Sequence, residues 1–416
     1  MKTLLKNISS LVTVASKGKK KLCGNEMNEV SEIKDASVLF DEKILWVGKT
    51  SEVDKIISNE HPEQVIELNN KTVIPGFVDS HTHIVFAGNR SNEFSRRLRG
   101  ATYEEIAKEG GGIQTTVKAT RNASIEELVQ NASQIAKNAI AHGTTTMEVK
   151  SGYGLTIESE IKQLKAIKRL AEALPIRIVP TFLGAHDFPP EYRDKKDKYI
   201  DIICNEMIPQ IAEEKLAVYV DAFVDMGYYT LEQAERIFST AISYGLKLRV
   251  HADELANVGA ASLAARFKAV SADHLLFVSD KGIEELKKAG TIATLLPGTA
   301  YFIRMPYAPA RKMIDNGLAI ALATDCNPGS CFTENMQIIL SLAVINMKMS
   351  AEEALTAATF NGAAALELSQ ICGSLEVGKQ ADFLILNTNS YTELFYHFGI
   401  NHVNEVWMAG RKIHQN

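Results

Sequence analysis

Residues 73–83, with the sequence VIPGFVDSHTH, decide how the fold of this chain is interpreted. The apolar run Val73–Asp79 predicts a buried strand, and His81 and His83 follow its end. Side chains two positions apart in a strand lie on the same face, so both imidazoles would point in one direction and could bind one metal ion. Alone, a His-x-His pair is a weak indication, because two ordinary histidines can stand at a strand end.

The middle of the chain, residues 73–370, alternates further short apolar runs with helical segments. After Val73–Asp79 we expect strands at Thr144–Val149, Ile176–Thr181, Ala217–Phe223, Leu248–His251, Ala269–Ala272, Thr291–Leu295 and Leu318–Ala323. Capping-box spacing marks helix starts at Ser124 with Glu127, Thr230 with Gln233, and Ser350 with Glu353. Eight strands with intervening helices predict an α/β fold, a (β/α)8 TIM barrel. A doubly wound sheet is the alternative, but no strand–Gly-x-Gly-x-x-Gly–helix unit supports it.

Both ends of the chain, residues 1–72 and 371–416, are rich in short β-like runs. Either end alone would form a thin sheet that buries little apolar surface. Chain termini often lie close together in a folded protein. We therefore expect the two ends to pair into one small composite β-sandwich domain beside the barrel domain of residues 73–370.

Composition limits the classes of function. The 416 residues carry a net charge of -5, so no basic surface for nucleic acid is indicated. No apolar stretch reaches the length of a membrane span, and the first residues resemble a β-strand more than a signal peptide. The five cysteines, without a Cys-x-x-Cys pair, favour a reducing, cytoplasmic setting. A homodimer is expected only because two-fold dimers are the commonest oligomers.

Three more predicted strands end in residues that bind metals. His251 ends one strand with Glu254 one helical turn later, His274 ends the next, and Asp325 follows the last. In a TIM barrel these strand ends meet at one face, which holds the active site. Histidines and an aspartate form the mixed nitrogen and oxygen set that suits one Zn²⁺ or Fe²⁺ ion with a position left for water.

The sequence resembles the amidohydrolase superfamily over nearly its whole length. The resemblance rests on Ile74–His83 and on the closing stretch Gly373–Phe383. Further motifs resemble the members that hydrolyse the ring C–N bond of 4-imidazolone-5-propanoate to N-formimino-L-glutamate in histidine degradation: Phe86–Arg90, Gly110–Ile113, Glu148–Leu155, Thr181–His186, His251–Glu254 and Thr324–Ser330. The resemblance implies metal ligands at His81, His83, His251 and Asp325. It implies contacts with a small anionic substrate at Arg90, Tyr153, His186, Glu254, Asn327, Gly329 and Ser330.

Each catalytic role then has a chemical reason. Arg90 offers a planar, two-pronged donor for the propanoate carboxylate. Asp325 can accept a proton from water, and Glu254 can exchange protons with the ring nitrogens. The resemblance implies that His274 holds or protonates the oxyanion, with a fourth nitrogen ligand as its alternative. Which of these three groups is the general base stays open.

Several alternatives follow from the same residues. The fourth strand region, Val218–Asp225, has no lysine to bridge two ions, so one metal is favoured, although Asp221 or Asp225 could conceivably serve. The Gly110–Gly112 stretch is either a flexible linker or a lid over a small ligand. As a whole, the chain could instead be a related amidohydrolase that deaminates a cyclic amidine or a nucleobase, or a non-catalytic protein on an inherited barrel.

Overall fold

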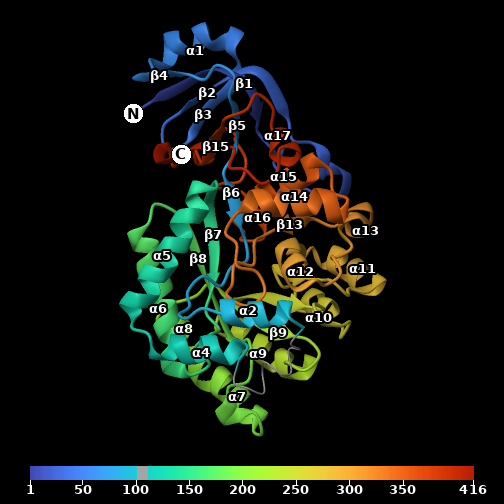
Figure 1. Cartoon of the computed structure of the whole chain (residues 1–416). Helices are drawn as coiled ribbons and strands as arrows, with labels where there is room; N and C mark the ends of the chain where they lie inside the picture. The colour runs from blue at the N-terminus through green and yellow to red at the C-terminus, as the bar shows by residue number, and fades with distance from the viewer. Residues whose placement is uncertain (101–110) are drawn as a thin grey trace.

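The computed structural model describes residues 1–100 and 111–416, which form two sheets and a shell of helices. The stretch proposed as a lid at Gly110–Gly112 therefore lies partly outside the described residues. Figure 1 shows the smaller sheet at one end, built from both ends of the chain, and the barrel with its helices below it. Within these ranges, none of the helices combines the length and apolar character that crossing a bilayer requires.

The larger sheet is the predicted barrel of parallel strands, in the order β13-β12-β11-β10-β9-β8-β7-β6. Its strands are β6 (Phe77–Asp79), β7 (Thr144–Lys150), β8 (Arg177–Ala185), β9 (Tyr219–Val224), β10 (Lys247–Ala252), β11 (Ser271–His274), β12 (Ile292–Leu295) and β13 (Ile320–Leu322). The two edges meet just beyond β6 and β13, where Thr82 and Cys326 form a parallel bridge. Beside it, Asp325 N donates to His81 O at 3.0 Å and His83 N donates to Cys326 O at 2.9 Å. This closure of the barrel brings the His-x-His segment next to Asp325.

Helices follow most barrel strands and cover their outer faces (Figure 1). They are α2 (Ser91–Leu98), α4 (Ile113–Asn122), α5 (Ile125–Ala141), α6 (Ile157–Ala173), α7 (Lys196–Ile202), α8 (Ile208–Glu213), α9 (Leu231–Ser243), α10 (Ala260–Arg266), α11 (Asp280–Ala289), α12 (Pro297–Ile303), α13 (Ala310–Asp315), α14 (Met336–Met347), α15 (Ala351–Ala358) and α16 (Phe360–Ala364). The three predicted capping boxes are confirmed, because Ser124, Thr230 and Ser350 each accept a hydrogen bond from the backbone three residues on.

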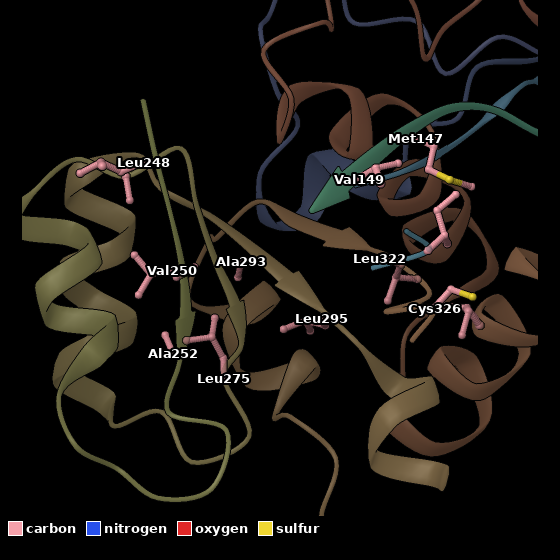
Figure 2. Packing of buried hydrophobic residues seen from close by; sticks show 14 of the residues in the cluster. Met147, Val149, Leu248, Val250, Ala252, Leu275, Ala293, Leu295, Leu322 and Cys326 are labelled. Atoms are coloured by element: carbon pink, nitrogen blue, oxygen red, sulfur yellow. The ribbon is translucent and has the colours of Figure 1, made fainter. Parts of the chain in front are cut away.

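Alternation along the strands separates an apolar outer face from a polar interior. Leu248, Val250 and Ala252 belong to the hydrophobic core cluster, and Figure 2 shows them between β10 and a neighbouring helix. Because side chains alternate across a strand, the residues between them, Arg249 and His251, point into the barrel. The barrel therefore presents charged groups and imidazoles inside an apolar shell.

The smaller sheet has eight strands drawn from both ends of the chain, in the order β16-β15-β14-β5-β1-β2-β3, with β4 paired to β1. They are β1 (Thr3–Val12), β2 (Glu32–Phe40), β3 (Ile44–Lys49), β4 (Gln64–Glu67), β5 (Thr72–Pro75), β14 (Phe383–Leu386), β15 (Val403–Met408) and β16 (Arg411–Gln415). Helices α1 (Val53–Glu60) and α17 (Glu393–Tyr396) flank it. Phe40 of β2 and Trp407 of β15 are several strands apart in this order, yet their ring centroids lie 5.6 Å apart. Since neighbouring strands are about 4.8 Å apart, the sheet must curl over on itself to enclose its own core.

The run Val73–Asp79, expected to be one barrel strand, is divided between the two sheets. Residues 72–75 form β5 and pair with β1 and β14, whereas residues 77–79 form β6 and pair with β7. Gly76 lies at the junction, and a Cβ there would overlap the Thr145 side chain. The expectation of a single strand was wrong because apolar character alone does not show where a chain passes from one sheet to another.

Candidate active site

A cavity of about 430 Å³ opens at the C-terminal ends of the barrel strands. Eleven of the predicted site residues line it: His83, Arg90, Tyr153, His186, His251, Glu254, His274, Asp325, Asn327, Gly329 and Ser330. His81 lies behind this wall, fully buried. Arg97, Ile113, Phe223, Tyr228, Leu255, Ile303 and Met305 complete the lining. Residues from many separate loops therefore form one pocket of the size of a small-molecule site.

The four predicted metal ligands gather at the floor of the cavity. Nε2 of His81 lies 3.2 Å from Nε2 of His83, and Asp325 Oδ1 is 3.6 Å from the first and 3.4 Å from the second. The ring centroid of His251 is 4.5 Å from that of His81. His274 joins the same cluster, since one ligand atom from each of His81, His251 and His274 lies within 4.8 Å of the others.

The protonation of these rings fits a divalent cation. His81 Nδ1 lies 2.7 Å from the Asp273 carboxylate, which can only accept, so the proton is on Nδ1 and the Nε2 lone pair faces the other ligands. Burial holds the pKa values of His81 and His83 well below their ordinary range, so both rings are neutral. Neutral imidazoles and a carboxylate with converging lone pairs are the donor set that zinc and iron sites use.

Asp325 is fixed on both sides. Its Oδ2 accepts a hydrogen bond from Thr299 Oγ1, and its main-chain carbonyl accepts one from the Asn327 side chain at 2.8 Å. Its backbone is left-handed, with φ of 51°. Burial raises the pKa of the carboxyl to about 6.

Glu254 and His274 face each other beside the ligand cluster, with Glu254 Oε2 3.5 Å from His274 Nε2. Glu254 N donates to Asp225 Oδ2 at 2.6 Å, which fixes where the side chain begins. Burial raises the pKa of Glu254 well above its ordinary value, and the carboxylates of Asp325 and Asp225 add to this effect. This raised pKa favours the protonated form of Glu254, which can donate a hydrogen bond to a bound ring.

Two arginines stand at the opposite wall, on and just before α2. Arg90 Nε donates to Glu93 Oε2 at 2.8 Å, which leaves the outer edge of its guanidinium toward the cavity. Arg97 Nη2 donates to Gly329 O at 3.1 Å, and its guanidinium lies 5.5 Å from the Phe302 ring centroid. Sequence reasoning missed Arg97. Its spacing of seven residues from Arg90, two helical turns, was the available signal.

The remaining predicted contacts are built by tight backbone packing. His186 Nδ1 lies 3.0 Å from Gly152 O and donates to it, and the ring stacks on His83 at a centroid distance of 5.2 Å. Burial lowers the pKa of His186 to about 3, so its free Nε2 is an acceptor. Gly152 has φ of 112°, and a Cβ there would lie 2.8 Å from Leu183 O. The neighbouring Tyr153 is buried, with its ring centroid 5.3 Å from that of His186.

The loop after Asp325 is organised by its own asparagine. Asn327 Oδ1 accepts hydrogen bonds from Gly329 N and Ser330 N, both at 2.8 Å. A Cβ on Gly329 would overlap Arg90 Nη1, so only glycine allows the loop and the arginine to approach this closely. Asn327 therefore shapes the wall on which Gly329 and Ser330 lie.

The two acids considered as possible bridges for a second metal are engaged elsewhere. Asp221 Oδ2 lies 2.9 Å from both His251 Nδ1 and Lys150 Nζ. Asp225 accepts hydrogen bonds from the backbone of Glu254, Leu255, Ala256 and Met226. Asp221 is engaged by His251 Nδ1 and Lys150, and Asp225 by backbone N–H groups, so neither is placed to bridge two ions, which favours one ion.

Known proteins resemble this chain over most of its length. The family model described as amidohydrolase family matches residues 72–413. A relative from Brevibacillus brevis named imidazolonepropionase is 47% identical over 98% of this chain and 96% of its own length. Another imidazolonepropionase, from Thermoanaerobacter pseudethanolicus, is 48% identical over 92% of this chain and 91% of its own length.

Among solved structures, a triazine hydrolase variant superposes with a TM-score of 0.77 at 18% identity, covering 100% of this chain and 95% of its own. An E. coli guanine deaminase gives a TM-score of 0.73 at 16% identity, covering 100% and 99%. At such identities the likeness concerns the fold alone. The fold, the converging histidines and the family match over residues 72–413 together establish that this chain belongs to the amidohydrolase family.

Proposed function

We propose that this chain is an imidazolonepropionase, which opens the ring of 4-imidazolone-5-propanoate with water to give N-formimino-L-glutamate. The observation that carries the proposal is that one cavity contains both a metal-binding floor and an arginine-lined wall. The floor suits activation of a cyclic amide, and the wall suits a carboxylate on the same small molecule. The relatives named imidazolonepropionase, at 47% and 48% identity, support it.

His81, His83, His251 and Asp325 would hold a single divalent cation, for which the choice is Zn²⁺ or Fe²⁺. When bound, such an ion supplies Lewis acidity at the ring carbonyl and eases the deprotonation of water near neutral pH. In this assignment His274 keeps its Nε2 for the reacting oxygen rather than serving as a ligand.

The wall of the cavity would orient the substrate. Arg90 binds the propanoate carboxylate through the outer edge of its guanidinium, because Glu93 occupies its Nε. The Nε2 of neutral His186 accepts a hydrogen bond from a ring N–H, and Tyr153 lies against the ring. Asn327, Gly329 and Ser330 close the remaining side.

Hydrolysis requires two proton movements. A water oxygen bonds to the ring carbonyl carbon, and its proton passes to Asp325, which is buried beside the ligand histidines. The carbon–nitrogen bond then breaks with its electron pair on nitrogen, and Glu254, kept protonated by burial, delivers a proton to that atom. His274 is placed to donate a hydrogen bond to the oxyanion that forms in between. The product gains one carboxylate and a formimino group.

The domain division, the cellular location and the assembly are further proposals. We propose a β-domain of residues 1–72 with 371–416 and a barrel domain of residues 73–370. The presence of two sheets supports this division, but β5 (Thr72–Pro75) belongs to the smaller sheet, which moves the boundary to Gly76. A cytoplasmic location agrees with the five free cysteines. A homodimer is the proposed assembly.

The experiment is to follow the absorbance of 4-imidazolone-5-propanoate with protein loaded with Zn²⁺ or with Fe²⁺, and with protein stripped of metal. Rapid loss with loaded protein and little loss with stripped protein is expected. A metal-replete protein that leaves the substrate intact would rule out this assignment. Release of ammonia from a cyclic amidine or nucleobase would then support the deaminase alternative.

A further inference from the structure

Among the described residues, a linked group of five charged side chains lies inside the barrel beneath the ligand cluster, and none of the five is exposed to solvent. They are Glu148, Lys150, Asp221, Arg249 and Asp273, which we call the buried charge network. None of them lines the substrate cavity. Buried charges are costly unless they are paired and hydrogen-bonded, and such pairs are weak evidence for stability alone. The arrangement of the network therefore calls for a role connected with the metal-binding residues above it.

One arm of the network leads to His251. Asp221 Oδ2 lies 2.9 Å from His251 Nδ1, and Asp221 Oδ1 accepts a hydrogen bond from His251 N at 3.1 Å. Lys150 Nζ bridges Asp221 at 2.9 Å and Glu148 at 2.7 Å. Burial lowers the pKa of Lys150, but the two carboxylates outweigh this and raise it, so the cation persists. The carboxylate holds the His251 proton on Nδ1 and leaves Nε2 free.

The other arm leads to His81. Asp273 Oδ2 lies 2.7 Å from His81 Nδ1 and accepts a hydrogen bond from Arg249 Nη2 at 3.1 Å. Arg249 also donates to Ser80 O at 2.7 Å and to Ala365 O at 2.6 Å, which fixes its position. It therefore holds both the carboxylate that orients His81 and the backbone residue just before it.

Glu148 connects the arms to the His-x-His segment itself. Its Oε2 accepts a hydrogen bond from Thr82 N at 3.2 Å, and Lys150 N donates to Thr82 O at 2.9 Å. Arg249 Nε lies 3.8 Å from Glu148 Oε1. The Glu148-x-Lys150 pair on β7 thus touches the backbone between two metal-binding histidines and, through Asp221, a third.

We propose that Lys150 and Arg249 are positioning residues for the metal ion. Each holds one carboxylate in place, and each carboxylate fixes the tautomer and direction of one metal-binding histidine. This inference rests on the proposed function, because it assumes that the ligand cluster binds a divalent cation. Outer partners of metal-binding histidines typically contribute about 10- to 100-fold to metal affinity. Lys150 acts one contact further out, and its removal leaves Asp221 without its cation.

The test measures the Kd for Zn²⁺ of the full chain by competition with a chromophoric chelator. Lys150→Met and Asp221→Asn are each expected to weaken binding about 10- to 100-fold, while KM measured at saturating Zn²⁺ stays unchanged. Lys379→Met is the matched control, because Lys379 is a buried lysine paired with Glu376 at 2.8 Å in the segment just before strand β14 of the smaller sheet. The control is expected to lower Tm and leave the Kd at the wild-type value.

A double variant, Lys150→Met with Asp221→Asn, tests whether the two residues act as one unit. Its loss of affinity should be smaller than the sum of the single losses in log Kd. If Lys150→Met fails to fold, the Kd of the isosteric variant Asp221→Asn provides the test. This variant keeps Lys150 paired with Glu148. A Kd within about twofold of wild type in the folded variant would overturn the inference while leaving the proposed function intact. A wild-type chain that binds no Zn²⁺ or Fe²⁺ would instead overturn the proposed function.

Discussion

Replacing Arg90 by alanine tests how the cavity recognises its substrate. The Arg90 side chain is only 13% exposed, and its Nε is occupied by Glu93, so two outer N–H groups remain for a carboxylate. A hydrogen bond to a charged group contributes about 1.5–3 kcal/mol, so two of them contribute about 3–6 kcal/mol. Arg97 stands on the same wall and water can enter the space left, so we expect the lower figure. A loss of about 3 kcal/mol corresponds to about 150-fold in kcat/KM.

The assay follows loss of 4-imidazolone-5-propanoate absorbance by wild type, Arg90→Ala and Arg90→Lys at saturating metal. Arg90→Lys keeps the charge without the two-pronged geometry and should lie between the other two. Gly329→Ala is a second variant, because its Cβ would displace Arg90 Nη1 without removing it. Gly329→Ala should raise KM, as Arg90→Ala does.

An analogue that ends in a methyl group instead of the carboxylate provides the control. Wild type and Arg90→Ala should hydrolyse this analogue at similar rates, since the contact under test is absent from both reactions. Equal losses of kcat/KM on the analogue and on the true substrate would refute the carboxylate role. Arg90 would then act only by shaping the loop.

Three further predictions address the metal ion, the proposed general acid Glu254 and the buried ion pair of Glu376. Removing the metal with a chelator should abolish hydrolysis and lower Tm, and adding Zn²⁺ at about 100 times its Kd should restore about 2.7 kcal/mol of stability; an unchanged Tm on metal addition would argue against the site. Glu254→Gln should lower kcat about 10²- to 10⁴-fold with little change in KM, because the amide keeps the hydrogen bond but not the transferable proton; stopped-flow absorbance measures both constants. Burial raises the pKa of Glu376, but hydrogen bonds from Lys379 and Ser374 outweigh burial and bring the pKa to about 2. These hydrogen bonds therefore stabilise the fold fully at pH values above the ordinary pKa of a glutamate, and this stabilisation is lost as the pH falls toward about 2. Thermal melts across acid pH should therefore show a steeper fall in Tm for wild type than for Glu376→Gln, and parallel curves would contradict this.

The barrel could be predicted because its signals are local. Short apolar runs between capped helices give the order of the strands, and a capping box such as Ser124 with Glu127 is visible in sequence alone. The passage at Gly76 could not be predicted, because β5 and β6 form one continuous apolar run. Only the position of Thr145 on the neighbouring strand explains why glycine is required there.

In the candidate site, the metal ligands could be predicted but their hydrogen-bond partners could not. Predicted ligands such as His81 and Asp325 follow strand ends, and any parallel barrel brings strand ends together. The partners of those ligands could not be predicted, since Asp273 contacts His81 only through the register of strands that are far apart in sequence. Lys150 was a further case, because a charged residue in an apolar strand does not by itself show which buried carboxylate it will meet.

Ring opening by water is tested most directly by mass spectrometry of the product that the metal-loaded chain forms in ¹⁸O-labelled water. We expect stoichiometric N-formimino-L-glutamate carrying one ¹⁸O atom in the new carboxylate, with no ammonia released. Unchanged substrate, or ammonia from a cyclic amidine or nucleobase under the same conditions, would contradict it.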